Sequence, residues 1–288
     1  MQTLSLWVPC LSLQTLTTKW KTIPERVAAI KMGSSRGVSG GVQEGFRGRW
    51  WAFSVFFVIF LGKEAGKTAK NMYLCARMKI AIVKYNAGNI YSVVHALRRL
   101  GVEPVLTDDA AELRAADKVL FPGQGEASQA MSYLREHGLD EVIRSLRQPV
   151  LGICIGQQLM CRHSEEGDTE CLGIFPAEVK RFQPQRHEDK VPHMGWNELR
   201  IENETLEMKH EGEEVSVNPL FRGLADGDFV YFVHSFYVPQ CEFTTATTDY
   251  ILPFSAALHK DNFYATQFHP EKSGATGEKI LRNFLEVE

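Results

Sequence analysis

From Met78 onward, short apolar runs are separated by stretches with the spacing of amphipathic helices. Strands that alternate with helices build a parallel sheet covered on both faces, so this pattern predicts an α/β fold. The expected strands of this half lie at 78–83, 104–107, 118–121 and 150–153. The first expected helix ends at Leu100 and is capped by Asn89 or Ser92; the others span 110–115, 128–137 and 139–146.

After Leu172, short strands and turns replace this alternation. Strands are expected at 178–182, 197–201, 228–233, 241–248, 254–259 and 263–268, and a last helix at 275–285. Functional loops of an open parallel sheet gather at the carboxyl ends of its strands. Cys154 and the loop formed by Gly123, Gln124 and Gly125 both follow expected strands, so the two are predicted to meet at this edge.

The first 77 residues differ in composition from the rest. They carry 11 Lys and Arg against 3 Asp and Glu, whereas the remainder holds 21 and 32. A glycine- and serine-rich run at 33–41 is typical of a flexible segment. The apolar run at 50–62 is shorter than the roughly 20 residues that a membrane-spanning helix needs. This segment is interpreted as an interfacial membrane anchor, a targeting extension, or upstream sequence translated from a start codon set too early. We favour the last, and expect 1–77 to be disordered or absent and one domain to fill 78–288.

The composition excludes several classes of function. The acidic remainder argues against a nucleic-acid binder. No G-x-x-x-x-G-K-[ST] motif occurs, so nucleotide hydrolysis is not expected. The six cysteines form no C-x-x-C pair and show no zinc spacing, and we expect neither a metal nor an organic cofactor. A reactive thiol would suit a reducing cytoplasm.

Cys154 stands where an apolar strand turns sharply into a helical pattern. Gly152 and Gly156 flank it and leave room for a turn too tight for a Cβ atom. The positive end of a helix dipole favours the thiolate, which is the reactive form. The amide of Ile155 would point towards an oxyanion forming above the sulfur. The alternative is a buried structural cysteine, because free cysteine is often a small buried hydrophobe.

A histidine and a carboxylate near the C-terminus favour the nucleophile. His269 and Glu271 are two residues apart, so in extended chain their side chains point the same way, and Pro270 stiffens the link. His269 could then take the thiol proton while Glu271 orients the imidazole. His-Pro-Glu alone is usually a surface turn. Together with the cysteine turn, it predicts a catalytic triad.

Two segments resemble the class I glutamine amidotransferases: Gly-Ile-Cys-Ile-Gly-Gln-Gln at 152–158 and Gln-Phe-His-Pro-Glu at 267–271. The segments 192–197 and 231–237 are similar to the glutaminase subunits of imidazole glycerol phosphate synthase. The resemblance runs from about Met78 to the end of the chain. It implies a flavodoxin-like domain that hydrolyses glutamine through a cysteine thioester. The ammonia would pass to a synthase that makes imidazole glycerol phosphate and aminoimidazole carboxamide ribotide in histidine biosynthesis.

The resemblance also implies further site residues. The backbone amides of Gln124 and Ile155 would hold the oxyanion, although the family usually has a small apolar residue where Gln124 stands. The expected substrate-binding residues are Gly123, Gly125, Gln158, Ser235 and Phe236.

The partner implied by the resemblance is a (β/α)₈-barrel cyclase subunit, in a heterodimer through which ammonia passes without meeting water. The interface residues that it implies are Asn89, Trp196, Tyr231 and Lys272. A lone tryptophan such as Trp196 is more often a core residue, but aromatic side chains also anchor interfaces. We interpret His193 and His234 as structural or interface residues, because His269 already fills the role of the base.

Besides a membrane-tethered interaction protein, which would depend on residues 50–62 alone, two rival interpretations stay open. One is a glutaminase subunit for another pathway, such as anthranilate, aminodeoxychorismate or pyridoxal phosphate synthesis; the segment 192–197 argues against it. The other is a catalytically silent binding subunit, against which the intact Cys154, His269 and Glu271 argue. Lys84 stands where many relatives carry an acid, so the first loop is expected to contact a partner differently.

Overall fold

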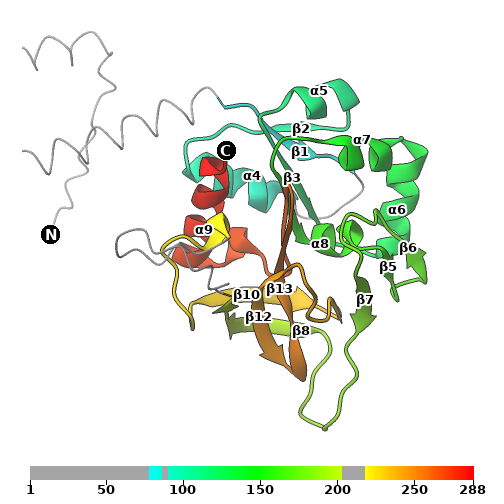
Figure 1. Ribbon diagram of the computed structural model, residues 1–288, viewed down its shortest axis with the longest axis vertical. Helices are drawn as coiled ribbons and strands as arrows, with labels where there is room; N and C mark the ends of the chain where they lie inside the picture. Colours follow the sequence, from blue (N-terminus) through cyan, green and yellow to red (C-terminus); the bar gives the residue numbers. More distant parts are fainter. Residues whose placement is uncertain (1–77, 86–89, 203–217) are drawn as a thin grey trace, which may run out of the picture. The chain divides into compact units, whose positions relative to one another are not determined.

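The structure is a computed structural model that describes residues 78–85, 90–202 and 218–288. The expectations for residues 1–77, including the apolar run at 50–62, and for the turn at 86–89 with Asn89 lie outside the described residues. Figure 1 shows the described part as one domain built around a sheet.

A central sheet of eight strands organises the domain, in the order β2-β1-β3-β4-β14-β13-β12-β9. The strands from β2 to β14 in this order run parallel, and β13, β12 and β9 continue the sheet antiparallel. The bounds are β1 (Ile80–Val83), β2 (Val105–Thr107), β3 (Lys118–Gly123), β4 (Val150–Cys154), β9 (Arg200–Ile201), β12 (Thr244–Tyr250), β13 (Leu252–Lys260) and β14 (Phe263–Thr266). The predicted α/β class with a mostly parallel sheet is confirmed.

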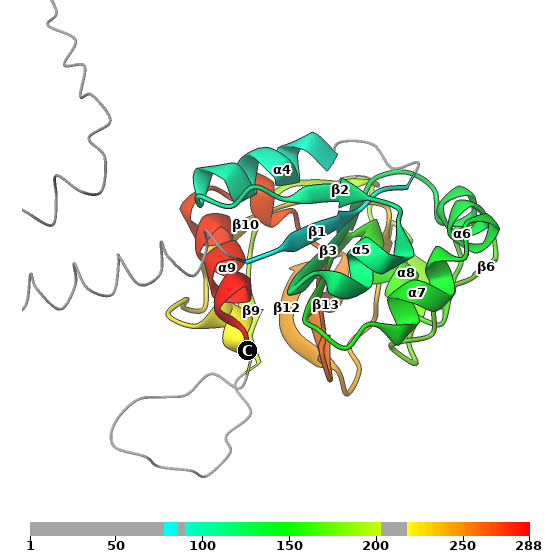
Figure 2. The ribbon, with the colours of Figure 1, turned by 90° about the horizontal axis from the view of Figure 1, so that it is seen from above.

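Helices cover both faces of this sheet, as the strand sequences require. In β1, Ile80 and Ile82 belong to one buried cluster with residues of α4 and α9, whereas Ala81 and Val83 belong to another with residues of α5 to α8. Successive strand residues point to opposite faces, so an all-apolar strand needs cover on both. Figure 2 shows α4 and α9 on one side of the central strands and α5 and α7 on the other. The helices are α4 (Ile90–Arg99), α5 (Ala110–Ala115), α6 (Ala127–Glu136), α7 (Leu139–Ser145), α8 (Ile155–Met160) and α9 (Gly274–Glu286).

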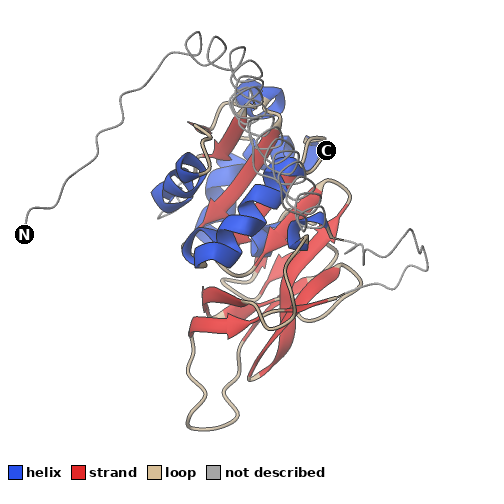
Figure 3. Cartoon of the chain, turned by 90° about the vertical axis from the view of Figure 1, so that its left-hand side faces the viewer, coloured by secondary structure: helices blue, strands red, loops and turns tan. Residues whose placement is uncertain are grey.

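Two smaller sheets accompany the second half of the domain, where Figure 3 shows strands with few helices. One pairs β8 (His193–Glu198) with β10 (Phe229–His234). The other has the order β11-β7-β5-β6 and contains β5 (His163–Ser164), β6 (Thr169–Glu170), β7 (Glu178–Arg181) and β11 (Phe236–Tyr237). Two short 3₁₀ helices complete this part, η1 (Pro219–Phe221) and η2 (Pro270–Lys272).

The first half follows the predicted elements closely, and in the second half β7, β10 and α9 lie where they were predicted, but other strands depart from the prediction. The strand predicted at 197–201 is wrong: β8 starts earlier, at His193, and β9 is a separate strand of the central sheet. Trp196, which precedes the predicted strand, therefore lies within β8. The strand predicted to reach Phe268 ends at Thr266. In both places long-range pairing, and not local pattern, sets the bounds.

Candidate active site

Cys154 ends β4 and immediately precedes α8, as the sequence predicted. Its backbone has φ 56° and ψ −105°, a strained conformation for a residue with a side chain. Gly156 makes the turn possible, because a Cβ there would collide with the carbonyl oxygen of Phe121. A Cβ on Gly152 would lie 3.0 Å from the Gly156 carbonyl carbon. The two glycines thus allow the helix to start directly against the neighbouring strand β3.

The glycine loop at the end of β3 lies beside the nucleophile candidate. Gly123 is the register partner of Cys154 in the parallel pair β3–β4, and Gln124 and Gly125 follow it. Ile155 opens α8, so its amide is among the first-turn N–H groups that have no acceptor within the helix. The structure therefore brings Gln124 and Ile155 to the two strand ends that meet at Cys154. Their role as oxyanion donors stays a prediction.

Tyr85 packs closely against the backbone of this loop at Gly123. A Cβ on Gly123 would collide with the Tyr85 hydroxyl, which shows how closely the ring approaches the loop backbone. The hydroxyl is buried and has no hydrogen-bond partner among the described residues. Burial, with a smaller contribution from the charge of Cys154, raises the pKa of Tyr85. The hydroxyl therefore stays protonated.

His269 and Glu271 meet as predicted, but not by the predicted geometry. Nδ1 of His269 lies 2.8 Å from Oε1 of Glu271. The two residues do not share an extended strand, because β14 has ended and Pro270 opens the 3₁₀ helix η2, with His269 as its N-cap. The turn folds the carboxylate back onto the ring. The i, i+2 argument from extended chain was therefore wrong, although the contact itself is present.

His269 has the electrostatic surroundings of a protonatable base. Burial lowers the pKa of His269, but the neighbouring Cys154 and the bonded Glu271 outweigh it and raise the pKa to about 10. The second ring nitrogen, Nε2, is buried without a hydrogen-bond partner among the described residues. One nitrogen is thus held by the carboxylate, which leaves the other free for proton transfer near Cys154.

Gln158 lies in α8, and its amide is fixed by two acceptors. Its Nε2 donates to the carbonyl oxygen of Phe236 at 3.0 Å and to Oε1 of Gln267 at 2.9 Å. Both amide protons are therefore used, and the side-chain oxygen is left as an acceptor. Phe236, which follows Ser235, thus contacts Gln158 through its backbone, and the role of these residues in substrate binding stays a prediction. The Cys154 thiol donates to the carbonyl of Val233 at 3.8 Å.

The sequence analysis did not identify Gln267. Its side chain is fully buried, accepts from Gln158, and places Nε2 3.8 Å from the Cys154 sulfur. Its place in the sequence could have indicated a role, because Gln267 precedes His269 by only two residues within the Gln-Phe-His-Pro-Glu segment. The position of its side chain depends on a contact between residues 113 apart in sequence.

His193 and His234 form a second buried histidine arrangement behind the site. His234 Nδ1 lies 2.7 Å from the Phe236 carbonyl oxygen, so this nitrogen carries the proton. Its Nε2 then accepts from Nδ1 of His193 at 3.1 Å. Burial lowers the pKa of His193 to about 4 and that of His234 to about 3. Both rings are neutral, as suits the structural role expected for them.

Three of the residues expected at an interface gather around the His269 turn. Trp196 is 54% exposed, and its ring lies edge-on to that of Tyr231 with 5.9 Å between centroids. The backbone of Tyr231 accepts from the His269 amide at 2.9 Å. Lys272 ends η2, which packs against the start of α9. Tyr231 therefore contacts both the exposed Trp196 ring and the backbone of the His269 turn.

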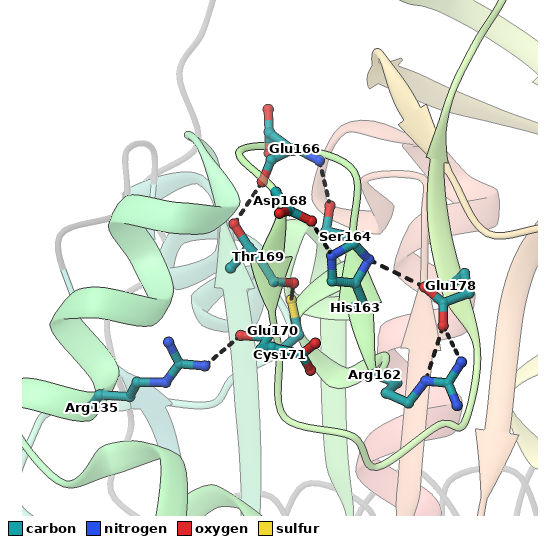
Figure 4. Close-up of polar contacts among 10 residues, drawn as sticks. All are labelled: Arg135, Arg162, His163, Ser164, Glu166, Asp168, Thr169, Glu170, Cys171 and Glu178. Atoms are coloured by element: carbon teal, nitrogen blue, oxygen red, sulfur yellow. Dashed lines mark hydrogen bonds and ion pairs between the residues drawn. The ribbon is translucent and has the colours of Figure 1, made fainter.

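A charged cluster on the β5–β7 sheet is separate from these residues. Figure 4 shows His163 between Asp168 and Glu178, which lie 2.9 Å and 3.2 Å from its two ring nitrogens. A hydrogen bond with Asp168, against a smaller effect of burial, raises the pKa of His163. Within residues 78–85, 90–202 and 218–288, no group of three or more His, Cys, Asp and Glu side chains is arranged to hold a metal ion.

Comparison with known proteins identifies related sequences. The family model for "Glutamine amidotransferase class-I" matches residues 81–287. A Bacteroides thetaiotaomicron protein named imidazole glycerol phosphate synthase subunit HisH is 64% identical over 210 residues, which cover 73% of this chain and all of that protein. A Yersinia pseudotuberculosis protein of the same name is 43% identical over 211 residues, with the same coverage of both chains.

Solved structures support the fold. A glutamine amidotransferase structure matches with a TM-score of 0.53 and 20% identity, covering 72% of this chain and 97% of that one. The structure of PurLQS from Thermotoga maritima matches with a TM-score of 0.51 and 16% identity, covering 73% and 98%. In the part of the chain that the structure describes, no helix has the length and apolar character needed to cross a membrane.

Proposed function

This chain belongs to the class-I glutamine amidotransferase family, and we propose that it releases ammonia from glutamine for the cyclase of imidazole glycerol phosphate synthase, through Cys154, His269 and Glu271. It is a glutamine amidotransferase that serves histidine biosynthesis. The observation that carries the proposed site is the carboxylate-bound imidazole of His269, whose pKa is raised by the neighbouring Cys154 at its strained turn.

The reaction is an acyl transfer. Cys154 attacks the side-chain amide of glutamine, and the amides of Gln124 and Ile155 hold the oxyanion. His269 passes a proton to the leaving ammonia, and a water that it then activates releases glutamate from the thioester. Glu271 keeps the ring oriented through its 2.8 Å contact.

Substrate binding rests on Gln158 and the segment of Ser235 and Phe236. Because both amide protons of Gln158 are engaged, its oxygen accepts, which suits the ammonium group of an amino acid. The glycine loop of Gly123 and Gly125 lies beside Cys154, with φ 131° at Gly125. The amino end of glutamine would then lie at Gln158 and the amide carbon above Cys154.

The partner is a (β/α)₈-barrel cyclase in a heterodimer. The relatives are named as subunits of a synthase. On this chain, the exposed Trp196 and the half-buried Tyr231 are in contact beside the turn that holds His269, with Lys272 at its end. Ammonia released at Cys154 could enter a partner bound there without crossing solvent. We place the complex in the cytoplasm, because a catalytic thiol must stay reduced.

Glutamate release from glutamine tests this function. Residues 78–288 and the full chain would be assayed alone and with a cyclase subunit carrying its nucleotide ligand. Strong stimulation by the cyclase is expected. Activity that ignores this partner would keep the chemistry and refute the pathway, whereas no release under either condition would refute the glutaminase.

A matched pair of variants locates the interface. Trp196→Ala is expected to raise the cyclase concentration needed for half-maximal stimulation by about tenfold or more, as for an aromatic anchor. Val105→Ala changes a similarly exposed apolar residue, 50% exposed, on the edge strand β2. An equal loss in both variants would contradict the placement of the interface at β8.

A further inference from the structure

We propose that Gln267 is a positioning residue of the glutaminase site: its amide, locked in one orientation by Gln158, donates to the sulfur of Cys154 and favours the thiolate. The inference deepens the proposed function, because it rests on Cys154 as the nucleophile. It starts from a fully buried amide whose nitrogen lies 3.8 Å from that sulfur.

The orientation of the Gln267 amide follows from its neighbours. A backbone carbonyl oxygen can only accept, so the Phe236 carbonyl fixes the NH₂ side of Gln158 towards itself. The second N–H of that same group then points to Gln267, 2.9 Å away, and requires an acceptor there. Oxygen must therefore face Gln158, which turns the Gln267 NH₂ group towards Cys154. Reversing the amide would set two N–H groups against each other.

The Phe236 carbonyl is itself held in place. His234 Nδ1 also donates to it at 2.7 Å, and His234 Nε2 accepts a hydrogen bond from His193 Nδ1 at 3.1 Å. A chain of hydrogen bonds thus runs from two neutral histidines through Phe236 and Gln158 to Gln267. Each hydrogen bond in this chain has only one possible donor, so the N–H of Gln267 is held towards Cys154.

The effect on the sulfur follows from the other contacts of Cys154. Its thiol form donates to the Val233 carbonyl at 3.8 Å, an acceptor that would repel a thiolate. The Gln267 N–H does the reverse, because a donor stabilises the charged acceptor more than the neutral one. The two groups therefore favour opposite protonation states, and removal of the Gln267 amide leaves the His269 imidazole as the group that favours the thiolate against the Val233 carbonyl.

The test uses Gln267→Met, which keeps the length of the side chain and removes both its donor to Cys154 and its acceptor for Gln158. The matched control is Gln157→Met, the same change at an equally buried residue whose amide donates to the Ser255 carbonyl instead. The measurement is the rate at which iodoacetamide alkylates Cys154 in the full chain, followed by mass spectrometry of the Cys154 peptide. This assay needs neither glutamine nor a partner.

At pH 7, Gln267→Met is expected to slow alkylation of Cys154 by about tenfold or more, the effect of one hydrogen bond to a charged group. At pH 9 the rate should return towards that of the unaltered protein, because base then supplies the thiolate. In glutamine turnover, kcat should fall by a similar factor, and KM should rise as well, because Gln158 loses one of the two acceptors that orient it. Gln157→Met should alkylate at the unaltered rate at pH 7.

Three results would overturn the inference: an unchanged rate at pH 7, a slow rate that persists at pH 9, or an equal loss in Gln157→Met. The second would mean blocked access and the third general destabilisation. Failure of the proposed function is distinct, since it would show as absent glutamate release by the unaltered protein whatever its alkylation rate.

Discussion

Two buried histidine regions lie close together in this domain and are held in opposite charge states. His269 binds a carboxylate and lies near a thiol, and its pKa is raised to about 10. His193 and His234 bind each other and a carbonyl, and burial lowers their pKa values to about 4 and about 3. Burial disfavours the imidazolium in both regions, so the difference comes from the partners.

The comparison separates catalytic from structural use of the same side chain. An imidazole beside an anion is prepared to carry a proton, whereas one whose nitrogens are engaged by neutral groups has a fixed tautomer and a fixed direction. The neutral pair is stacked among rings, with His193 lying 3.9 Å from Tyr250 and 4.8 Å from Phe232 between centroids. It serves as a rigid support for the Phe236 carbonyl.

Removal of the Cys154 thiol should have the largest effect on glutamine hydrolysis. Cys154→Ala is expected to lower glutamate release by about four orders of magnitude, because no other group replaces the nucleophile. It should also lower the pKa of His269, whose rise depends on Cys154. The rate and the imidazole resonances, by NMR, would be followed, with binding to the cyclase as the control for folding. Retained turnover would refute the nucleophile.

A change at the carboxylate should have the next largest effect. Glu271→Gln removes the negative charge but keeps the shape, so the pKa of His269 should fall, and the rate should drop by roughly a hundredfold or more. The shift of the pH–rate profile checks both. Glu166→Gln makes the same change on a half-buried carboxylate of the β5–β6 turn, where it accepts from the Ala127 amide. An equal drop there would show that the effect is not specific to the site.

The smallest of the expected effects is the change that the neutral pair, His193 and His234, causes in the free energy of unfolding as pH is lowered. In the unfolded chain His193 and His234 take up protons below about pH 6.5, whereas in the folded chain they do not until about pH 4 and pH 3. The unfolded state therefore binds more protons in this window, and stability falls as pH is lowered. The slope is at most about 1.4 kcal/mol per pH unit for each histidine.

Urea unfolding between pH 7 and pH 5 measures that slope, and His193→Gln should reduce it. The control is His163, whose pKa is raised, so that its protonation stabilises the fold at low pH. His163→Gln should therefore steepen the fall of the unfolding free energy towards pH 5. If His193→Gln leaves the slope of unfolding free energy against pH unchanged, His193 is not held neutral in the folded protein.

Local pattern predicted much of the fold and the centre of the site. The helix at 110–115 matches α5, and β4 and α8 meet at Cys154 as expected, because glycines on both sides of a cysteine leave one kind of turn. The meeting of His269 with Glu271 was predicted too, since only two residues separate them. The extended geometry given for it was wrong, because Pro270 starts a 3₁₀ turn.

The sequence by itself determined the α/β order, the nucleophile turn and the family, because these depend on residues that are near neighbours in the chain. Only the tertiary structure decided that β8 begins at His193, that His193 pairs with His234 across 41 positions, and that Gln267 faces Cys154 across 113. Those contacts depend on strand order and register. A one-residue change of register turns a side chain to the other face, so no local pattern could specify them.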